Sequence, residues 1–169
     1  MPDVVFETPR LLGRRLEPGD HAAMLAVYGD AEGMRFVGNG RPLTAEECER
    51  WIVVSVDNYR QRGYGMFALV ERASGAVVGF CGLVHPRQQV EAELKYAFLP
   101  SAWGRGLATE AAAALLGYAR AGLGLASVMA TVDPEHVASQ RVLAKAGMAR
   151  GALRDNDDGS RTQLFHWRA

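Results

Sequence analysis

The chain has 169 residues, and its 19 lysine and arginine residues balance its 19 aspartate and glutamate residues, so its formal net charge is zero. This length predicts a single domain, residues 1–169, that buries roughly two-thirds of the surface of the unfolded chain and needs no disulfide. The balanced charge and the lack of a lysine or arginine block argue against nucleic-acid binding. Cys48 and Cys81 form no C-x-x-C pair and no paired histidine spacing occurs, so we expect reduced thiols and no metal site. No apolar run reaches membrane-spanning length and residues 1–9 lack the pattern of a signal peptide, which favours a soluble, cytoplasmic protein without a membrane partner.

The first half of the sequence predicts strands and helices in alternation. Residues 10–16 are typical of a strand, and the helix that follows has Asp20 in the position of its cap. Thr44 and Glu47 form a capping box for a second, longer helix, which ends at Gly63.

The second half is richer in strands. Apolar runs predict strands over 64–71, 76–84 and 90–99, followed by an alanine-rich helix over 107–121. Beyond that helix we expect a strand over 126–132, a helix over 137–146 and a final hairpin of strands over 148–153 and 163–168. The acidic turn of the hairpin lacks the glycine and glutamate positions of an EF-hand, so we expect a solvated turn and no calcium site. The order of elements predicts a mixed α/β fold.

The glycine-bearing turn before the alanine-rich helix carries the strongest functional signal. Gly104 and Gly106 lack a Cβ atom, so the backbone can curl with several N–H groups facing one point, and the helix adds the positive end of its dipole. Such a turn is suited to a pyrophosphate. It is not a Walker loop, because Leu107 and Ala108 stand where lysine and serine or threonine are needed. It also departs from a dinucleotide fingerprint, since Thr109 takes the third glycine position.

Trp-Gly-Arg-Gly-Leu-Ala at 103–108 resembles the coenzyme A loop of the GNAT acetyltransferases, with Trp103 where glutamine or arginine is usual. Together with the Thr-Glu that follows, it is similar to the branch that contains the RimJ/RimL-type acetyltransferases of ribosomal-protein N-termini. Residues 133–148 resemble the second cofactor segment of the family, N-x-x-S-x-x-x-x-x-K-x-G-F. Further resemblance to this branch lies in Thr8-Pro9-Arg10-Leu11-Leu12 and in residues 17–20, 44–51 and 79–83. The resemblance implies the GNAT fold, a mixed, mostly antiparallel sheet of about six to seven strands with about four helices.

The same resemblance implies acetyl-CoA as the cofactor. The residues that it places at the cofactor are Phe98, Leu99, Trp103, Gly104, Arg105, Gly106, Leu107, Ala108, Thr109, His136 and Ser139. A backbone N–H near Phe98 or Leu99 is expected to polarise the thioester carbonyl if the strands separate there. His136 stands in the place of the asparagine of the family, where an imidazole can donate to a pantetheine carbonyl or can simply be exposed at the start of a helix.

Acetyl transfer to an amine requires a base, because the amine arrives protonated. Glu93 matches the glutamate-bearing strand of the branch and is the expected general base, acting through a water. Glu91 alternates onto the same face and is the alternative, and the two would be solvent-facing carboxylates if neither takes part. Leu143 occupies the position of the tyrosine that protonates the leaving thiolate in many GNAT enzymes. Ser139 therefore becomes the candidate acid, unless it is only a helix cap.

The acceptor is expected to lie against the first two helices, their loop and the hairpin near His85, because these parts cover the acceptor in the family. The candidate acceptor-binding residues are Arg35, Trp51, His85 and Glu91, although an aromatic such as Trp51 is commonly a core residue. We expect an N-acetyltransferase for a primary amine, with a peptide N-terminus favoured by the resemblance and an aminoglycoside, polyamine or amino acid as alternatives. The neutral chain lacks the acidic excess that would favour a polycationic drug. A catalytically weak acyl-CoA-binding sensor or partner module is the alternative function, and the chain is expected to be a monomer or homodimer.

Overall fold

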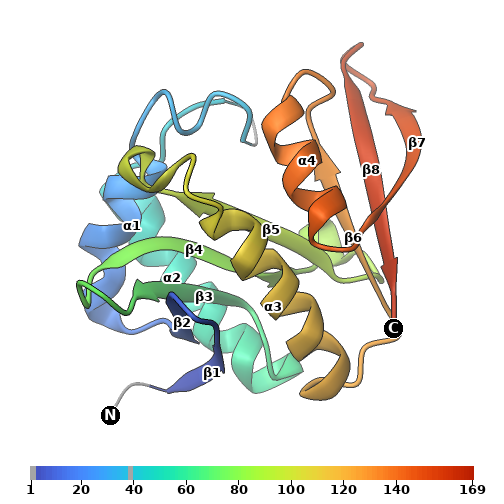
Figure 1. Ribbon diagram of the computed structural model, residues 1–169. Coiled ribbons are helices and arrows are strands. Elements are labelled where there is room, and N and C mark those ends of the chain that lie inside the picture. Colours follow the sequence, from blue (N-terminus) through green and yellow to red (C-terminus); the bar gives the residue numbers. More distant parts are fainter. Residues whose placement is uncertain (1–2, 38–39) are drawn as a thin grey trace.

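The computed structural model describes residues 3–37 and 40–169, so Met1 and Pro2, the start of the segment that lacks a signal-peptide pattern, lie outside the described residues. A single eight-stranded sheet with the order β1-β2-β3-β4-β5-β6-β8-β7 forms its centre (Figure 1). The strands are β1 (Val4–Glu7), β2 (Leu11–Arg15), β3 (Met66–Glu71), β4 (Val77–Val84), β5 (Glu93–Phe98), β6 (Ser127–Val132), β7 (Ala149–Asp155) and β8 (Arg161–Arg168). Neighbouring strands are antiparallel except β5 and β6, which are parallel. The mixed, mostly antiparallel sheet is confirmed, with slightly more strands than expected.

Helices cover both faces of the sheet. They are α1 (His21–Tyr28), α2 (Ala45–Arg62), α3 (Leu107–Ala121) and α4 (Val137–Lys145), with short 3₁₀ turns η1 (Pro18–Asp20), η2 (Pro86–Gln88) and η3 (Pro100–Ala102). The helices α3 and α4 lie on one face of the sheet, and α1 and α2 lie on the other (Figure 1). Two clusters of buried side chains, one on each face, hold these layers together. The expected number of helices is therefore confirmed for the described part of the chain.

Local signals placed the ends of the longer helices correctly. The hydroxyl of Thr44 accepts from the N–H of Glu47 at 3.2 Å, and the carboxylate of Glu47 accepts from the N–H of Thr44, also at 3.2 Å. Gly63 ends α2 with φ 84°, a left-handed conformation that glycine adopts at little cost. These contacts involve residues close in sequence, which is why periodicity and capping rules find them.

One strand was missed, and two expectations at the edges of elements were wrong. The strand β1 was missed, because four residues give too short a pattern to identify. The carboxylate of Asp20 does not cap α1; it accepts from the N–H of Glu17 at 2.7 Å and forms two 2.8 Å hydrogen bonds with the guanidinium of Arg14. The strand β5 begins at Glu93 rather than at Val90, a residue that is 97% exposed.

The two parallel strands meet at one position only. Glu93 of β5 is paired with Met129 of β6, and the N–H of Met129 donates to the carbonyl of Ala92 at 2.9 Å. Beyond this bridge the two strands diverge (Figure 1). The first turns of α3 and α4 lie on either side of the opening, and this is where the candidate site is found.

Candidate active site

The turn before α3 has the geometry of an anion cradle. Gly104 and Gly106 have φ of 73° and 79°, and Gly106 is the N-cap of α3 without any side-chain cap. A Cβ atom at Gly104 would meet no other atom within 4 Å, so the backbone conformation, rather than crowding, requires glycine there. The first N–H groups of an α-helix have no partner inside the helix, and the N-cap Gly106 has no side chain to accept from them. The structure therefore offers free donors at a positive helix end.

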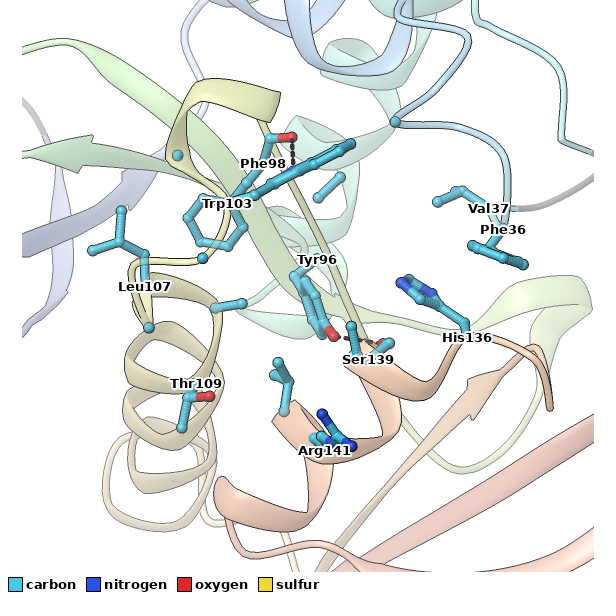
Figure 2. A pocket seen from close by; sticks show the side chains of 18 of the residues that line it. Phe36, Val37, Tyr96, Phe98, Trp103, Leu107, Thr109, His136, Ser139 and Arg141 are labelled. Atoms are coloured by element: carbon cyan, nitrogen blue, oxygen red, sulfur yellow. Dashed lines mark hydrogen bonds between the residues drawn. The ribbon is translucent and has the colours of Figure 1, made fainter.

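A pocket of about 660 Å³ opens in front of this turn. It extends from the first turn of α3, across the end of β5, to the first turns of α4 and the loop after α1. Gly104, Gly106 and Thr109 line one end, and Arg141 and Lys145 of α4 contribute cationic side chains. Figure 2 shows Thr109 and Arg141 on facing sides of the pocket. Its size is typical of a site for a small molecule or cofactor.

The end of β5 presents a backbone donor to the opening. The N–H of Leu99 donates to the carbonyl of Val78 at 2.9 Å, on the β4 side. Because successive backbone groups of a strand point to opposite sides, the N–H and carbonyl of Phe98 face the side on which β6 has diverged. The indole Nε1 of Trp103 donates to that carbonyl at 3.0 Å (Figure 2). Of the two backbone N–H groups expected to polarise a carbonyl, the one of Leu99 is already used, and the one of Phe98 faces the opening.

Tyr96 and Ser139 meet across the opening. The hydroxyl of Tyr96 on β5 lies 2.5 Å from Oγ of Ser139 on α4, and either atom can be the donor (Figure 2). Burial raises the pKa of Tyr96, and the hydrogen bond with Ser139 lowers it by less. Ser139 is therefore not merely a helix cap. Sequence reasoning did not single out Tyr96 as a candidate residue, although it shares a strand face with Phe98 and, like the glycine-bearing turn, lines the pocket.

His136 lies at the start of α4 and closes the other end of the pocket. Its imidazole stacks on the ring of Phe36 at 4.6 Å between centroids and 18° between planes (Figure 2). Burial lowers the pKa of His136, and the charge of Asp133 opposes this shift. His136 is thus half-buried in the pocket rather than simply exposed. Arg35, the neighbour of Phe36, also lines the pocket, and its guanidinium lies 5.0 Å from the centroid of that ring.

Comparison with known proteins assigns the family. A family model described as the acetyltransferase (GNAT) domain matches residues 10–149. The chain belongs to the GNAT acetyltransferase family. It is 26% identical over 152 residues to an uncharacterized N-acetyltransferase, YoaA, of Bacillus subtilis, covering 89% of this chain and 86% of that protein.

Solved structures show the same fold. A GNAT-family acetyltransferase from Bacillus anthracis superposes with a TM-score of 0.84 at 23% identity, covering 96% of this chain and 97% of that one. RimL, a ribosomal alpha-N-protein acetyltransferase solved in complex with coenzyme A, superposes with a TM-score of 0.82 at 15% identity, covering 98% of each chain.

In this GNAT acetyltransferase, Glu93 lies at the bridge where β5 and β6 separate. Its side chain is 4% exposed; Oε2 accepts from Oγ1 of Thr131 at 2.9 Å and lies 2.8 Å from Nζ of Lys95. Side chains alternate along a strand, so Glu93 and Ala97 face the α1/α2 side while Tyr96 faces the α3/α4 side. The solvent-facing alternative for Glu93 is therefore wrong. Glu93 itself does not line the pocket, whereas Ala97 does.

Several other candidate residues lie outside the pocket. Trp51 packs on Tyr28 at 5.6 Å between ring centroids, and the residue remains 40% exposed. His85 is held between the hydroxyl of Tyr64 and the carbonyl of Gln89, each at 2.7 Å.

Glu91 and Arg105 also depart from their expected places. Glu91 precedes β5, so the expected alternation with Glu93 does not apply. The side chain of Arg105 forms an ion pair with Glu71 and points away from the pocket, which leaves only its backbone at the turn. Of the expected acceptor-binding residues, Arg35 lines the pocket; Gly38 and Asn39, in the same loop, lie outside the described residues.

The other histidine, cysteine and acidic side chains of the described residues are the groups that could form a metal or thiol site. Within residues 3–37 and 40–169, no three histidine, cysteine, aspartate or glutamate side chains gather in a way that could hold a metal ion. Cys48 and Cys81 are free and buried, and burial raises the pKa of both thiols. Among the helices described, none combines the length and apolarity of a membrane span.

Proposed function

We propose that this acetyltransferase transfers an acetyl group from acetyl-CoA to a primary amine by direct attack. The observation that supports this most strongly is the coincidence of three features in one pocket: the left-handed turn at Gly104 and Gly106, the uncapped start of α3 and the separation of β5 from β6. The first two suit a diphosphate, and the third gives a thioester access to a backbone donor. When bound, acetyl-CoA supplies the acetyl group as an activated thioester.

The residues present fit this cofactor. The N–H groups at the start of α3 and the turn itself would hold the diphosphate, since a Cβ atom at Gly104 would meet no protein atom and the turn is open on that side. Arg141 and Lys145 line the same pocket and supply positive charge for phosphate groups. The pantetheine arm would run along the opening, between the end of β5 and the start of α4.

Two sets of donors lie near the end of β5: one for the thioester carbonyl of acetyl-CoA and one for its sulfur. The N–H of Phe98 faces the opening and can donate to a carbonyl oxygen that gains negative charge. Tyr96 and Ser139 share a hydrogen bond and can hand a proton to the departing thiolate. Because burial raises the pKa of Tyr96, its hydroxyl stays protonated at neutral pH and Ser139 can be resupplied from it. Many GNAT enzymes have a tyrosine as the acid at the position of Leu143, which is a buried core residue here. The Tyr96–Ser139 pair would take over that role.

Glu93 remains our candidate base. It lies at the apex of the opening, on the face opposite Tyr96, so an amine that arrives past Ala97 has the base on one side and the acid on the other. Its buried position requires a water to carry the proton, and a general base can act through one water. His136 is the competing candidate, because it lines the pocket and its lowered pKa keeps the imidazole neutral at pH 7.

The acceptor that we propose is a peptide N-terminus, as in the RimJ/RimL-like branch. Support comes from the sequence motifs of that branch and from the fold shared with RimL. Glu32 and Arg35, in the loop after α1, line the pocket, and they can pair with the ammonium and carboxylate groups of a peptide. An amino acid, polyamine or aminoglycoside is the alternative acceptor.

A screen for thiol release tests the proposal. The protein is incubated with acetyl-CoA and a panel of peptides, amino acids, polyamines and aminoglycosides, and free coenzyme A is measured. We expect release that depends on a peptide with a free N-terminus. Binding of coenzyme A without release on any amine would instead identify an acyl-CoA sensor or partner module, and absence of binding would refute both functions.

A further inference from the structure

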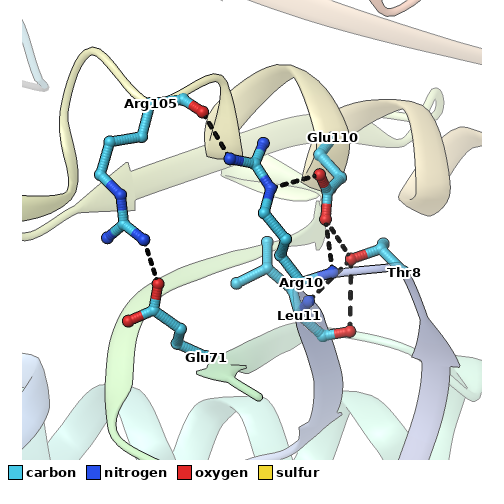
Figure 3. Close-up of polar contacts among 6 residues, drawn as sticks. All are labelled: Thr8, Arg10, Leu11, Glu71, Arg105 and Glu110. Atoms are coloured by element: carbon cyan, nitrogen blue, oxygen red, sulfur yellow. Dashed lines mark hydrogen bonds and ion pairs between the residues drawn. The ribbon is translucent and has the colours of Figure 1, made fainter. Parts of the chain in front are cut away.

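A set of polar contacts ties the turn between β1 and β2 to the start of α3 (Figure 3). Nε of Arg10 lies 2.9 Å from Oε1 of Glu110, and the backbone N–H of Arg10 donates to Oε2 of the same carboxylate at 3.0 Å. The second arm of the guanidinium donates from Nη1 to the carbonyl of Arg105 at 2.7 Å. One arginine thus joins a helix residue to the backbone of the glycine-bearing turn.

The carbonyl that Arg10 binds lies in the middle of the glycine-bearing turn. Arg105 lies between Gly104 and Gly106, the two left-handed glycines. A turn with two glycines has many accessible backbone conformations, so the direction of its N–H groups is not fixed by the local sequence. Arg10 holds the carbonyl in the middle of the turn, while the side chain of Arg105 is held from the other side by Glu71 (Figure 3).

Glu110 is itself held in place. The hydroxyl of Thr8 donates to Oε2 of Glu110 at 2.5 Å, and the N–H of Leu11 donates back to that hydroxyl at 2.8 Å. Desolvation raises the pKa of Glu110, but the hydrogen bonds from Thr8 and Arg10 and the charge of Arg10 lower it overall. Glu110 therefore remains a carboxylate at neutral pH and can orient Arg10.

The exposure of the pair argues against a role in stability alone. The side chains of Arg10 and Glu110 are 44% and 18% exposed. An ion pair of this kind contributes little to the free energy of unfolding because solvent screens it. The same geometry can nevertheless decide the conformation of a flexible turn, and preorganisation of a binding loop raises affinity.

We propose that Arg10 and Glu110 are positioning residues that hold the turn at Gly104–Gly106 in the shape that receives the diphosphate of acetyl-CoA. This inference rests on the proposed function. Neither residue lines the pocket. They act through the carbonyl of Arg105 and the first turn of α3, so their effect is confined to the part of the ligand that this turn contacts.

The test compares Arg10→Gln with Arg72→Gln. Arg72 forms a 2.9 Å ion pair with Glu7, also between partly exposed side chains, but does not contact the turn, so it controls for the loss of a surface charge. The affinity for coenzyme A is measured by calorimetry, and KM and kcat are measured with acetyl-CoA and with S-acetylpantetheine, which lacks the diphosphate. We expect Arg10→Gln to weaken coenzyme A binding and raise KM for acetyl-CoA by about tenfold, the effect of one charge-assisted hydrogen bond. The constants for S-acetylpantetheine should stay within about twofold of those of the wild type, and Arg72→Gln should change neither ligand.

Further variants keep the outcome decisive. Glu110→Gln retains an acceptor for Thr8 and loses the charge that orients Arg10, so it should reproduce part of the loss, and the double variant should lose less than the sum of the two. Should Arg10→Gln fail to fold, Glu110→Gln carries the same comparison. Unchanged coenzyme A affinity in both folded variants, or equal losses for acetyl-CoA and S-acetylpantetheine, overturns the proposal. A wild-type protein that binds no coenzyme A refutes the proposed function instead.

Discussion

The hydroxyl of Tyr96 lies 2.5 Å from Oγ of Ser139, so β5 and α4 touch through two side chains at the point where the sheet opens. This contact sits beside the N–H of Phe98 and in front of the glycine-bearing turn. A donor for a leaving sulfur would have to lie here. In the proposed mechanism, this hydrogen-bonded pair would supply the proton that many GNAT enzymes take from a tyrosine of the second cofactor segment.

The variant Tyr96→Phe removes only the hydroxyl. We expect kcat to fall by about 100-fold or more, as for the loss of a general acid, with little change in KM for acetyl-CoA. Ser139→Ala should act in the same direction, and the double variant should resemble the more severe single one because the two hydroxyls act as a unit. The control is Tyr64→Phe, whose hydroxyl bonds His85 outside the pocket. Equal kcat for Tyr96→Phe and Tyr64→Phe would contradict the assignment.

A pair of glycine variants tests the anion cradle. Gly104 and Gly63 both have a left-handed φ, and a Cβ atom at either would meet nothing within 4 Å. Alanine at either position should lower the free energy of unfolding by about 1–2 kcal/mol, the cost of a left-handed conformation for a non-glycine residue. Only Gly104→Ala should also weaken coenzyme A binding, by about tenfold, since the turn relaxes to a shape in which its N–H groups no longer converge. Calorimetry and urea unfolding separate the two effects, and equal coenzyme A affinity for both variants refutes the cradle.

The base is tested by Glu93→Gln with Glu91→Gln as its control. Turnover should fall by about 100-fold to 10,000-fold for Glu93→Gln, with coenzyme A affinity nearly unchanged, as expected for the loss of a general base. Glu91→Gln should retain wild-type turnover, because Glu91 lies outside β5 and outside the pocket. If Glu93→Gln is fully active and His136→Asn is not, the base is His136.

The stack of His136 on Phe36 predicts a pH dependence. Burial lowers the pKa of His136, so the unfolded chain binds a proton more readily than the folded one. The stabilising contribution of the stack is therefore present above the unfolded pKa, about 6.5, and declines as the pH falls below it. The charge of Asp133, just before α4, opposes the shift, and the guanidinium of Arg35 lies over the ring of Phe36 on which His136 stacks.

The measurement for His136 is urea unfolding between about pH 5 and pH 8, a range that brackets the pKa of a histidine in an unfolded chain. Wild type should lose stability relative to His136→Asn as the pH falls, whereas the difference should be constant above about pH 7. The variant restores the residue usual in the family and should bind coenzyme A at least as well as the wild type. Parallel stability curves throughout would mean that the imidazole is free to ionise in the folded state.

Much of the fold could be predicted from local sequence signals. Thr44 with Glu47, Gly63 and the glycines of the turn each act on neighbours within a few residues, so propensity and spacing rules identify them. The contacts of Tyr96 with Ser139 and of Arg10 with Glu110 join residues that are 43 and 100 positions apart in the sequence. Periodicity contains no information on such pairs. The placement of Trp51 and His85 away from the pocket likewise follows from packing against Tyr28 and Tyr64 rather than from residue type.

The sheet consists of two parts, strands β1 to β5 and strands β6, β8 and β7, and within the described residues the only strand pairing between these parts is the bridge between Glu93 and Met129. Within each part the strands are joined by longer antiparallel ladders, so we expect relative motion of the two parts to concentrate at the β5–β6 junction. If acetyl-CoA binds between β5 and β6 as proposed, its polar groups would be able to take the place of strand-to-strand hydrogen bonds that are missing there. Binding of the cofactor should therefore slow amide hydrogen exchange in β6 as well as in the glycine-bearing turn. The sheet as a whole is then expected to be more rigid in the cofactor-bound protein than in the free protein.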